Sequence, residues 1–144
     1  MEKSLVLSVS VGTGCYRHIR IGDDATLMKL SSAILSAFSF DDDHLHSFFM
    51  NNRAWDHSAE FVCPAGDLDG ALGYTDEVKL SQFRFDKGDK FMYVFDYGDD
   101  WRFQIRVLRV IDEPTTSYNI LKSVGYVSQY GDWDWDDDDD DDED

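Results

Sequence analysis

Apolar and polar side chains alternate with a period of two through residues 90–111, the most regular pattern in the chain. The apolar set, over 91–97 and again over 101–107, is mostly aromatic and β-branched. Such alternation places one set of side chains on the core and the other on the opposite face of a strand. Gly98-Asp99-Asp100 supplies residue types that tolerate tight bends. The pattern predicts a long aromatic β-hairpin.

Two further strands and one helix are predicted upstream of the hairpin. Residues 3–11 and 15–21 alternate in the same way and are joined by a glycine-rich turn. Asp24 or Thr26 can then cap a helix that runs to about Phe38, because large apolar residues recur there along one stripe. We therefore expect one main helix, in the first third of the chain.

The remaining segments are less regular. Residues 46–50 are typical of a short strand, and residues 56–77 indicate a long surface connection with a short strand around Phe61. One helical turn is expected over 78–83, and residues 118–130 are expected to be irregular. The fold class predicted is α+β: a largely antiparallel sheet with the aromatic hairpin, packed by one main helix and short helical turns. The protein would be a monomer, or a homodimer that uses an exposed edge of the hairpin.

Charge divides the chain into two parts. The formal net charge is -17, and residues 132–144 hold eleven acidic residues and no basic one, which leaves a net charge of -6 upstream. A long run of like charges repels itself and buries no apolar surface. We expect a single domain over 1–131 and a disordered acidic tail over 132–144.

Composition and segment length favour a cytoplasmic protein. No run approaches the ~18 apolar residues of a membrane span, and the alternating N-terminal segment is more typical of a strand than of a signal peptide. Cys15 and Cys63 are too few for a disulfide scaffold. We expect free thiols, no cofactor and no membrane contact.

Four segments carry a resemblance to a known family. They are Tyr16-Arg17-His18-Ile19, the helix before Phe38, His44-Leu45-His46-Ser47-Phe48, and Tyr93-Val94-Phe95-Asp96-Tyr97-Gly98-Asp99-Asp100-Trp101, the most specific one. In order and spacing they resemble the plasmid pRiA4b ORF-3-like family, over most of residues 3–110. The resemblance implies an α+β fold with helices against a largely antiparallel sheet, and an association with plasmid or transposon-borne genes in some relatives.

The chain also departs from the pattern of many relatives. Phe103 stands where they usually have a histidine, and the Pro-Pro-Glu-Asp-x-Gly-Gly segment near their C-terminus is absent. A role of that histidine or of that segment therefore does not transfer, and the resemblance implies no particular reaction.

The first candidate site joins Arg17 with Asp96 and Asp99. Arg17 shares its strand face with two isoleucines, and a guanidinium taken out of water needs a carboxylate, for which Asp96 is the natural choice. A structural ion pair is the favoured interpretation. One alternative is a small anion site in which Arg17 binds a phosphate or carboxylate. The other is a ligand pocket, in an enzyme or a small-molecule-binding protein, formed by Arg17, His44, Asp96, Asp99 and Trp101.

The second candidate is a metal site at His44 and His46. In an extended segment their imidazoles point the same way, and Asp41, Asp43 or Cys63 would complete a divalent cation site. The chain has no Cys-x-x-Cys or HExxH motif to support it. We expect instead that one histidine hydrogen-bonds the main chain and the other faces solvent, with no metal bound.

The third candidate is a basic surface. Arg102, Gln104 and Arg106 share one face of the predicted hairpin, and with His18 and Arg20 they would form a basic face suited to nucleic acid. The acidic net charge argues against nucleic acid as a partner. A solvated sheet face is the default interpretation, and a surface that docks the protein's own acidic tail is an alternative.

The acidic tail is the most distinctive chemical feature. Trp133 and Trp135 precede seven aspartates, Asp136–Asp142. Two indoles are costly to leave in water, and a dense negative charge attracts basic surfaces over a distance. Since no catalytic constellation is recognisable, the sequence favours a non-enzymatic protein-interaction or regulatory module whose partner is a basic protein.

Overall fold

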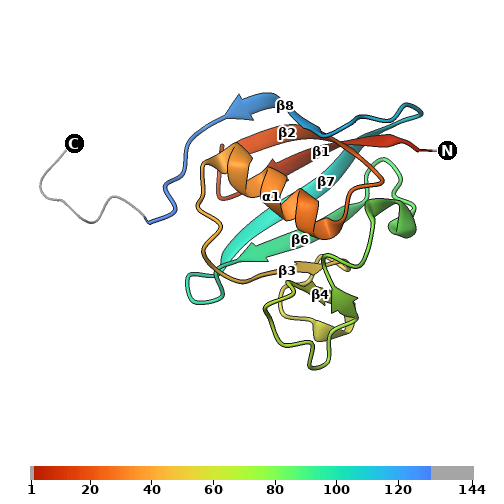
Figure 1. Ribbon diagram of the computed structural model, residues 1–144. Helices are drawn as coiled ribbons and strands as arrows, with labels where there is room; N and C mark the ends of the chain where they lie inside the picture. The colour runs from red at the N-terminus through yellow and green to blue at the C-terminus, as the bar shows by residue number, and fades with distance from the viewer. Residues whose placement is uncertain (1, 131–144) are drawn as a thin grey trace, which may run out of the picture.

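The computed structural model describes residues 2–130 (Figure 1). The acidic tail, with its predicted disorder, lies outside the described residues. The elements, in chain order, are β1 (Ser4–Ser10), β2 (Tyr16–Gly22), α1 (Leu27–Phe38), β3 (His46–Phe49), η1 (His57–Ala59), β4 (Glu60–Val62), β5 (Gly73–Tyr74), η2 (Leu80–Phe83), β6 (Lys90–Phe95), β7 (Trp101–Ile111) and β8 (Tyr118–Val124). Among the described residues, no helix is long and apolar enough to cross a membrane.

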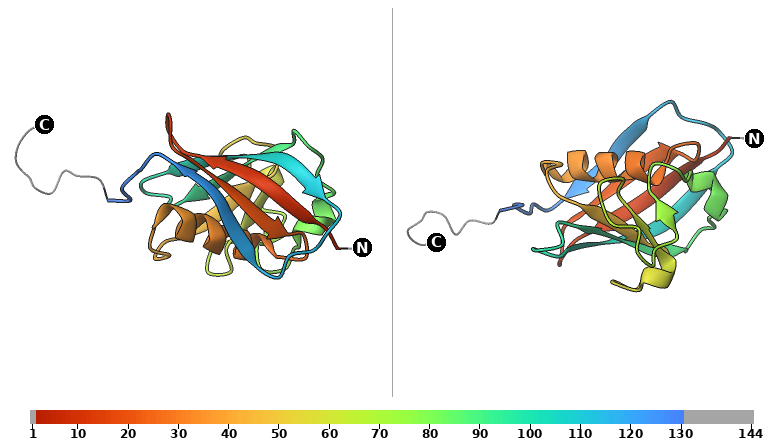
Figure 2. Two further views of the ribbon diagram at one scale, coloured as in Figure 1. Left: turned by 90° about the horizontal axis from the view of Figure 1, so that it is seen from above. Right: turned by 60° about the horizontal axis from the view of Figure 1, so that its bottom comes forward.

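The strands form one eight-stranded sheet in the order β5-β4-β3-β6-β7-β1-β2-β8. Every neighbouring pair is antiparallel except β4 and β5, which are parallel. The helix α1 lies across one face of this sheet, in front of β1, β2 and β7 (Figures 1 and 2). The predicted α+β class, with a mostly antiparallel sheet and one main helix, is confirmed.

The aromatic hairpin forms where the alternation predicts it. β6 pairs with β7 from Lys90 opposite Arg106 to Phe95 opposite Trp101. Six of its alternating apolar positions are fully buried, namely Phe91, Tyr93, Phe95, Phe103, Ile105 and Val107. However, β3 pairs with β6 and β1 pairs with β7. The hairpin is therefore central, and the prediction that it offers an exposed edge is wrong. In the described part of the chain the free edges belong to β5 and β8.

The edge strand β8 corrects another expectation. Residues 118–130 were expected to be irregular, yet Tyr118–Val124 pairs antiparallel with β2. Most side chains of β8 are exposed. Because an edge strand exposed on both faces needs no apolar alternation, its sequence gives no period to detect. The short strand near Phe61 and the turn over 78–83 are confirmed as β4 and η2, whereas β5 was not predicted.

The helix α1 closes the core from one side. Thr26 caps its N-terminus, where the side-chain oxygen accepts from the main-chain N–H of Lys29 at 3.1 Å. Ser39 ends it with a left-handed backbone at φ 61°. Its buried stripe contributes roughly 1.5–3 kcal/mol for each large apolar side chain. That stripe consists of Leu27, Leu30, Ser31, Ala33, Ile34, Leu35 and Phe38.

The opposite face of the sheet is covered only at one end. There Trp55 packs its ring against Phe49 at 5.6 Å and against Tyr97 at 5.2 Å between centroids. In the described residues no α-helix covers the rest of this face, over β7, β1, β2 and β8 (Figure 2). We call it the outer face.

Replacing Ser31 by alanine tests the polar contact inside the core. Ser31 Oγ and Tyr93 Oη lie 2.6 Å apart, and both residues are buried. The substitution leaves the Tyr93 hydroxyl without its partner, so we expect the free energy of unfolding to fall by about 1–3 kcal/mol. Urea denaturation measures it. Ser32→Ala, at an exposed position of the same helix, should change stability by less than about 0.5 kcal/mol, and equal losses in both variants would contradict the prediction.

Candidate functional site

Arg17 is buried on the helix side of β2, but its partners are main-chain carbonyls. Its Nε donates to the carbonyl oxygen of Ala37, and one terminal nitrogen donates to those of Tyr16 and Val124, each at 2.9 Å. Its guanidinium also lies 4.5 Å from the centroid of the Phe38 ring. The predicted ion pair with Asp96 is wrong: among the described residues, the hydrogen-bond partners of Arg17 are main-chain carbonyls and no carboxylate lies at ion-pair distance.

The position of Arg17 follows from the helix that it touches. Ala37 lies in the last turn of α1, where carbonyl oxygens lack partners within the helix and carry the negative end of its dipole. The last turn of α1 itself has no basic residue. Arg17 supplies that cation from the neighbouring strand and links the helix to β8 through Val124. Arg17 therefore has a bracing role, away from Asp96 and Asp99.

His44 and Asp96 do meet. The Nε2 atom of His44 lies 3.4 Å from Asp96 Oδ2 and 3.5 Å from Asp43 Oδ1. Asp96 has a left-handed backbone at φ 60°, and its carboxylate accepts from the main-chain N–H of Asp99 at 3.3 Å. Asp96 thus shapes the β6–β7 turn, while the half-exposed His44 sits at its edge. Of the predicted pocket, the structure joins His44, Asp96 and Asp99 and leaves Arg17 out.

Trp101 lies at the start of β7 beside a hollow. Its indole packs edge-on against Phe40, with 5.1 Å between centroids. Its Nε1–H is buried and has no hydrogen-bond partner in the part of the chain that the structure describes. The hollow has a volume of about 570 Å³ and is lined by Val11, Gly12, Asp99, Asp100, Trp101, Arg102, Ser128, Gln129 and Tyr130.

The two candidate metal ligands line another, smaller hollow of about 220 Å³, together with Cys63. His46 is buried, and its Nε2 lies 2.9 Å from Thr75 Oγ1. Burial lowers the pKa of His46 to about 4. Within residues 2–130, no three His, Cys, Asp or Glu side chains are grouped so as to hold a metal ion. His46 is held by a hydroxyl instead of the main chain that we expected.

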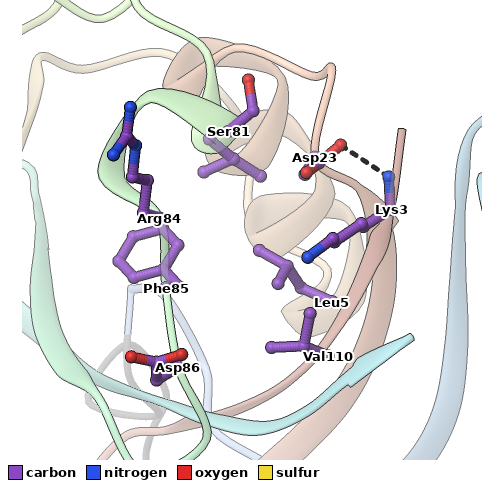
Figure 3. A pocket seen from close by; sticks show the side chains of 9 residues that line it. Lys3, Leu5, Asp23, Ser81, Arg84, Phe85, Asp86 and Val110 are labelled. Atoms are coloured by element: carbon purple, nitrogen blue, oxygen red, sulfur yellow. Dashed lines mark hydrogen bonds between the residues drawn. The ribbon is translucent and has the colours of Figure 1, made fainter. Parts of the chain in front are cut away.

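A further hollow of about 350 Å³ lies at the opposite end of β1 and includes none of the predicted residues. Its floor is apolar, and Figure 3 shows Phe85 facing Leu5 across it. On one side Asp23 accepts from the main-chain N–H of Lys3 at 3.0 Å. The rim holds two cations and two carboxylates, Lys3, Arg84, Asp23 and Asp86, so its charge favours neither anionic nor cationic ligands.

A polar network at the covered end of the sheet face opposite α1, on β3 and β4, was missed by the sequence analysis. Glu60 is buried, yet Ser47 donates to one of its oxygens and His57 Nδ1 lies near the other, both at 2.6 Å. Tyr97 Oη lies 2.5 Å from Ser47 Oγ. The hydrogen bond to Glu60 raises the pKa of His57. Ser47 is fully buried, so the network fastens β3 to β4 and offers no accessible nucleophile.

The outer face carries six of the chain's 13 Lys and Arg residues. The register places Arg106 and His18 on either side of Ser8, Lys122 beyond His18, and Lys90 beyond Arg106. We call the following set the cationic face: His18, Arg20, Lys90, Arg102, Arg106, Arg109 and Lys122. The prediction that Arg102, Arg106, His18 and Arg20 share one face is therefore confirmed. Which ligand or partner binds the cationic face stays a prediction.

Comparison with known proteins identifies the fold and the family. The family model of the plasmid pRiA4b ORF-3-like protein matches residues 7–127. The chain belongs to the plasmid pRiA4b ORF-3-like family. It is also similar to the crystal structure of a protein of unknown function, MM3350 from Methanosarcina mazei Go1. That likeness has a TM-score of 0.67 at 23% identity, over 85% of this chain and 70% of the other. No curated protein matches.

Within this plasmid pRiA4b ORF-3-like protein, the departure at Phe103 has a packing explanation. Phe103 is fully buried, with its ring 5.1 Å from that of Phe38 and 5.6 Å from that of Tyr93. Phe103 fills the core between the helix and the hairpin. This protein therefore cannot use a histidine side chain at this position.

The buried imidazole of His46 predicts a loss of stability in acid. In the unfolded chain His46 takes up a proton near its ordinary pKa of 6.5, whereas the folded protein resists it down to about 4. Stability from this residue is thus present above pH 6.5 and is lost as the pH falls toward 4, by up to about 1.4 kcal/mol per pH unit. Urea denaturation at several pH values measures the slope.

His46→Gln should flatten that slope between pH 6.5 and 4 relative to the parent protein. His44→Gln, at an exposed imidazole, is the matched control and should keep it. If His46→Gln fails to fold, titration of the imidazole by NMR in the parent protein decides the matter. A normal pKa for His46 there would contradict the prediction.

Proposed function

We propose that this chain is a non-enzymatic interaction or regulatory module of the cytoplasm that recruits a basic protein through its acidic C-terminal segment. In some relatives such a module would act beside plasmid or mobile-element genes. Trp133 and Trp135 provide the apolar anchors, and Asp136–Asp142 provide the long-range attraction.

The carrying observation is the concentration of charge. Eleven of the 30 acidic residues lie within residues 132–144, where no basic residue balances them. A field of this density raises the rate of encounter with a basic surface, and the attraction weakens as salt increases. Indole rings are frequent anchors at interfaces because they bury a large area at a small entropic cost.

The contacts of the conspicuous polar residues support a bracing role for the folded part. Arg17 donates hydrogen bonds to three main-chain carbonyls. Asp96 stabilises a turn, and His46 hydrogen-bonds Thr75. Groups that are engaged in this way have little freedom to take part in a reaction. We therefore assign partner binding to the charged C-terminal segment.

Changes confined to that segment test the proposal. In the full chain, replacing Asp136–Asp142 by asparagine, or Trp133 and Trp135 by alanine, should reduce capture of the partner from a lysate of the source cell by about tenfold or more, because each removes one part of the interface. Quantitative mass spectrometry of pull-downs measures it. Asp67→Asn with Asp69→Asn, at exposed positions elsewhere, is the control and should leave capture unchanged. An identical set of captured proteins from all variants would sink the proposal.

A second candidate function, binding of a small molecule, is favoured by one observation. The buried Nε1–H of Trp101 has no partner among the described residues, and the hollow beside it also has Gln129 and two carboxylates in its lining. A buried donor without an acceptor costs about 1–3 kcal/mol. A neutral ligand with a hydrogen-bond acceptor would remove that cost, whereas Asp99 and Asp100 disfavour an anion.

A fragment set of small neutral amides and heterocycles tests the second candidate. If the hollow is a binding site, some fragments will shift the indole N–H signal of Trp101 in NMR spectra, and Trp101→Phe will weaken them at least tenfold. Trp55→Phe, on the other face of the sheet, is the control and should leave binding unaffected. Fragments that bind Trp101→Phe as well as the parent would contradict a site at this indole.

A further inference from the structure

On the outer face, two small side chains of β1 form a strip between longer polar side chains of β7 and β2, several of which are cationic. Along β1, Ser8 and Ser10 face outward, with β7 on one side and β2 on the other. Next to Ser8 stand Arg106 on β7 and His18 on β2. Short hydroxyl-bearing residues leave room above β1, and the flanking cations surround that room with donors. Such a strip suits an extended anionic segment.

The charge of this strip is mostly uncompensated. Within residues 2–130, no carboxylate lies at ion-pair distance from Lys90, Arg106, Arg109 or Lys122. The two other cations are paired at the margins, Arg102 with Asp100 at 2.9 Å and Arg20 with Glu113 at 3.9 Å. Six of the 13 Lys and Arg residues therefore gather on one face of a protein with a net charge of -17.

The chain leaves the folded part beside this strip. Gln129 accepts from the main-chain N–H of Asp41 at 2.7 Å, and Tyr130 donates to Asp43. Gln129 and Tyr130 also line the same hollow as Gly12 and Arg102. Gly12 follows β1, and Arg102 begins the cationic row of β7. The last described residues are thus fixed where the strip begins.

We propose that the acidic segment 132–144 docks on the cationic face of its own chain. The fourteen residues after Tyr130 can extend about 46 Å at 3.3 Å per residue, whereas Arg102 and Arg109 are about 23 Å apart along a strand. The aspartates pair with Arg106, Arg109 and Lys122, and the two tryptophans lie near the exit point.

This inference rests on the proposed function and adds its regulation. A docked segment is hidden from a basic partner, which has to compete with the chain's own cations for the same aspartates. The affinity for the partner is then reduced by the fraction of molecules in which the segment is docked. Burial and then the positive charge of Lys122 lower the pKa of His18, and the second of these causes reflects the cations gathered on this face.

NMR spectra of the full chain test the docking without any partner. Replacing Asp136–Asp142 by asparagine should shift main-chain amide signals on β1, β2 and β7, including those of Ser8, His18 and Arg106. Raising the salt to about 1 M, where the screening length falls to about 3 Å, should move the parent signals in the same direction. Signals of α1, on the other face, should stay in place.

Charge reversal on the face supplies the matched comparison. In Arg106→Glu with Lys122→Glu, the asparagine replacement should no longer shift these signals, because the aspartates have already been released. Lys29→Glu with Lys79→Glu changes the net charge equally but lies on the helix side, and should retain the full response. If the reversed protein folds poorly, Arg106→Ala with Lys122→Ala serves in its place.

Three results would overturn the inference. The first is an unchanged cationic face after the asparagine replacement. The second is a response that grows with protein concentration over a tenfold range, which would assign the contact to a second copy. The third is a face that binds a single-stranded DNA oligonucleotide equally well with and without the aspartates, which would assign it to nucleic acid. Capture of a partner by the acidic segment can persist in each case, so the two proposals fail separately.

Discussion

Among the described residues, one twelve-residue α-helix shields one face of an eight-stranded sheet, and this constraint shapes the packing around it. The space that one helix leaves is filled by large rings. Phe40 contacts Phe95, Trp101 and Phe103, and Phe85 stacks on Phe91 with 4.9 Å between centroids. Aromatic side chains bury the most area per residue, which explains why the central hairpin is built from them. The second face is left largely to water.

Burial on the helix side decides what its polar residues do. Arg17, Ser31 and His46 are removed from water, so each must find a partner nearby or destabilise the fold. Arg17 donates to one open carbonyl at the end of α1 and to two strand carbonyls, Ser31 hydrogen-bonds the hydroxyl of Tyr93, and His46 lies beside Thr75. These contacts tie α1 to β2 and β6, and β3 to the long connection after β4. They give the buried polar residues of the helix side a structural role.

The outer face shows why net charge is a poor guide to local chemistry. A charge of -17 argues against any contact with polyanions, but an electrostatic field in physiological salt decays within about 8 Å. Over that distance the cations near Arg106 and Lys122 outweigh acids located elsewhere. The pleat of the sheet produces this separation, because alternate residues of β7 and β2 project to opposite sides. An acidic protein can therefore carry a surface that attracts aspartates, including its own.

The sequence by itself determined the elements whose signals are local. The alternation over residues 90–111 and the apolar stripe before Phe38 correctly predicted β6, β7 and α1, because period and capping depend on near neighbours. The family followed from short motifs within these elements, and the co-location of Arg102 and His18 followed from their alternation.

Only the tertiary structure decided the sheet order, the edge strand β8, and the partners of the buried polar groups. Arg17 bonds to Val124, 107 positions away, and His46 to Thr75, 29 positions away. No period links residues so distant, and β8 has no buried face to impose one. Aspartate was the natural guess for Arg17 because sequence shows charges but not which carbonyls a helix end leaves open. The partners of Arg17 depend on where the C-terminus of α1 packs against β2, and only the tertiary structure determines that position.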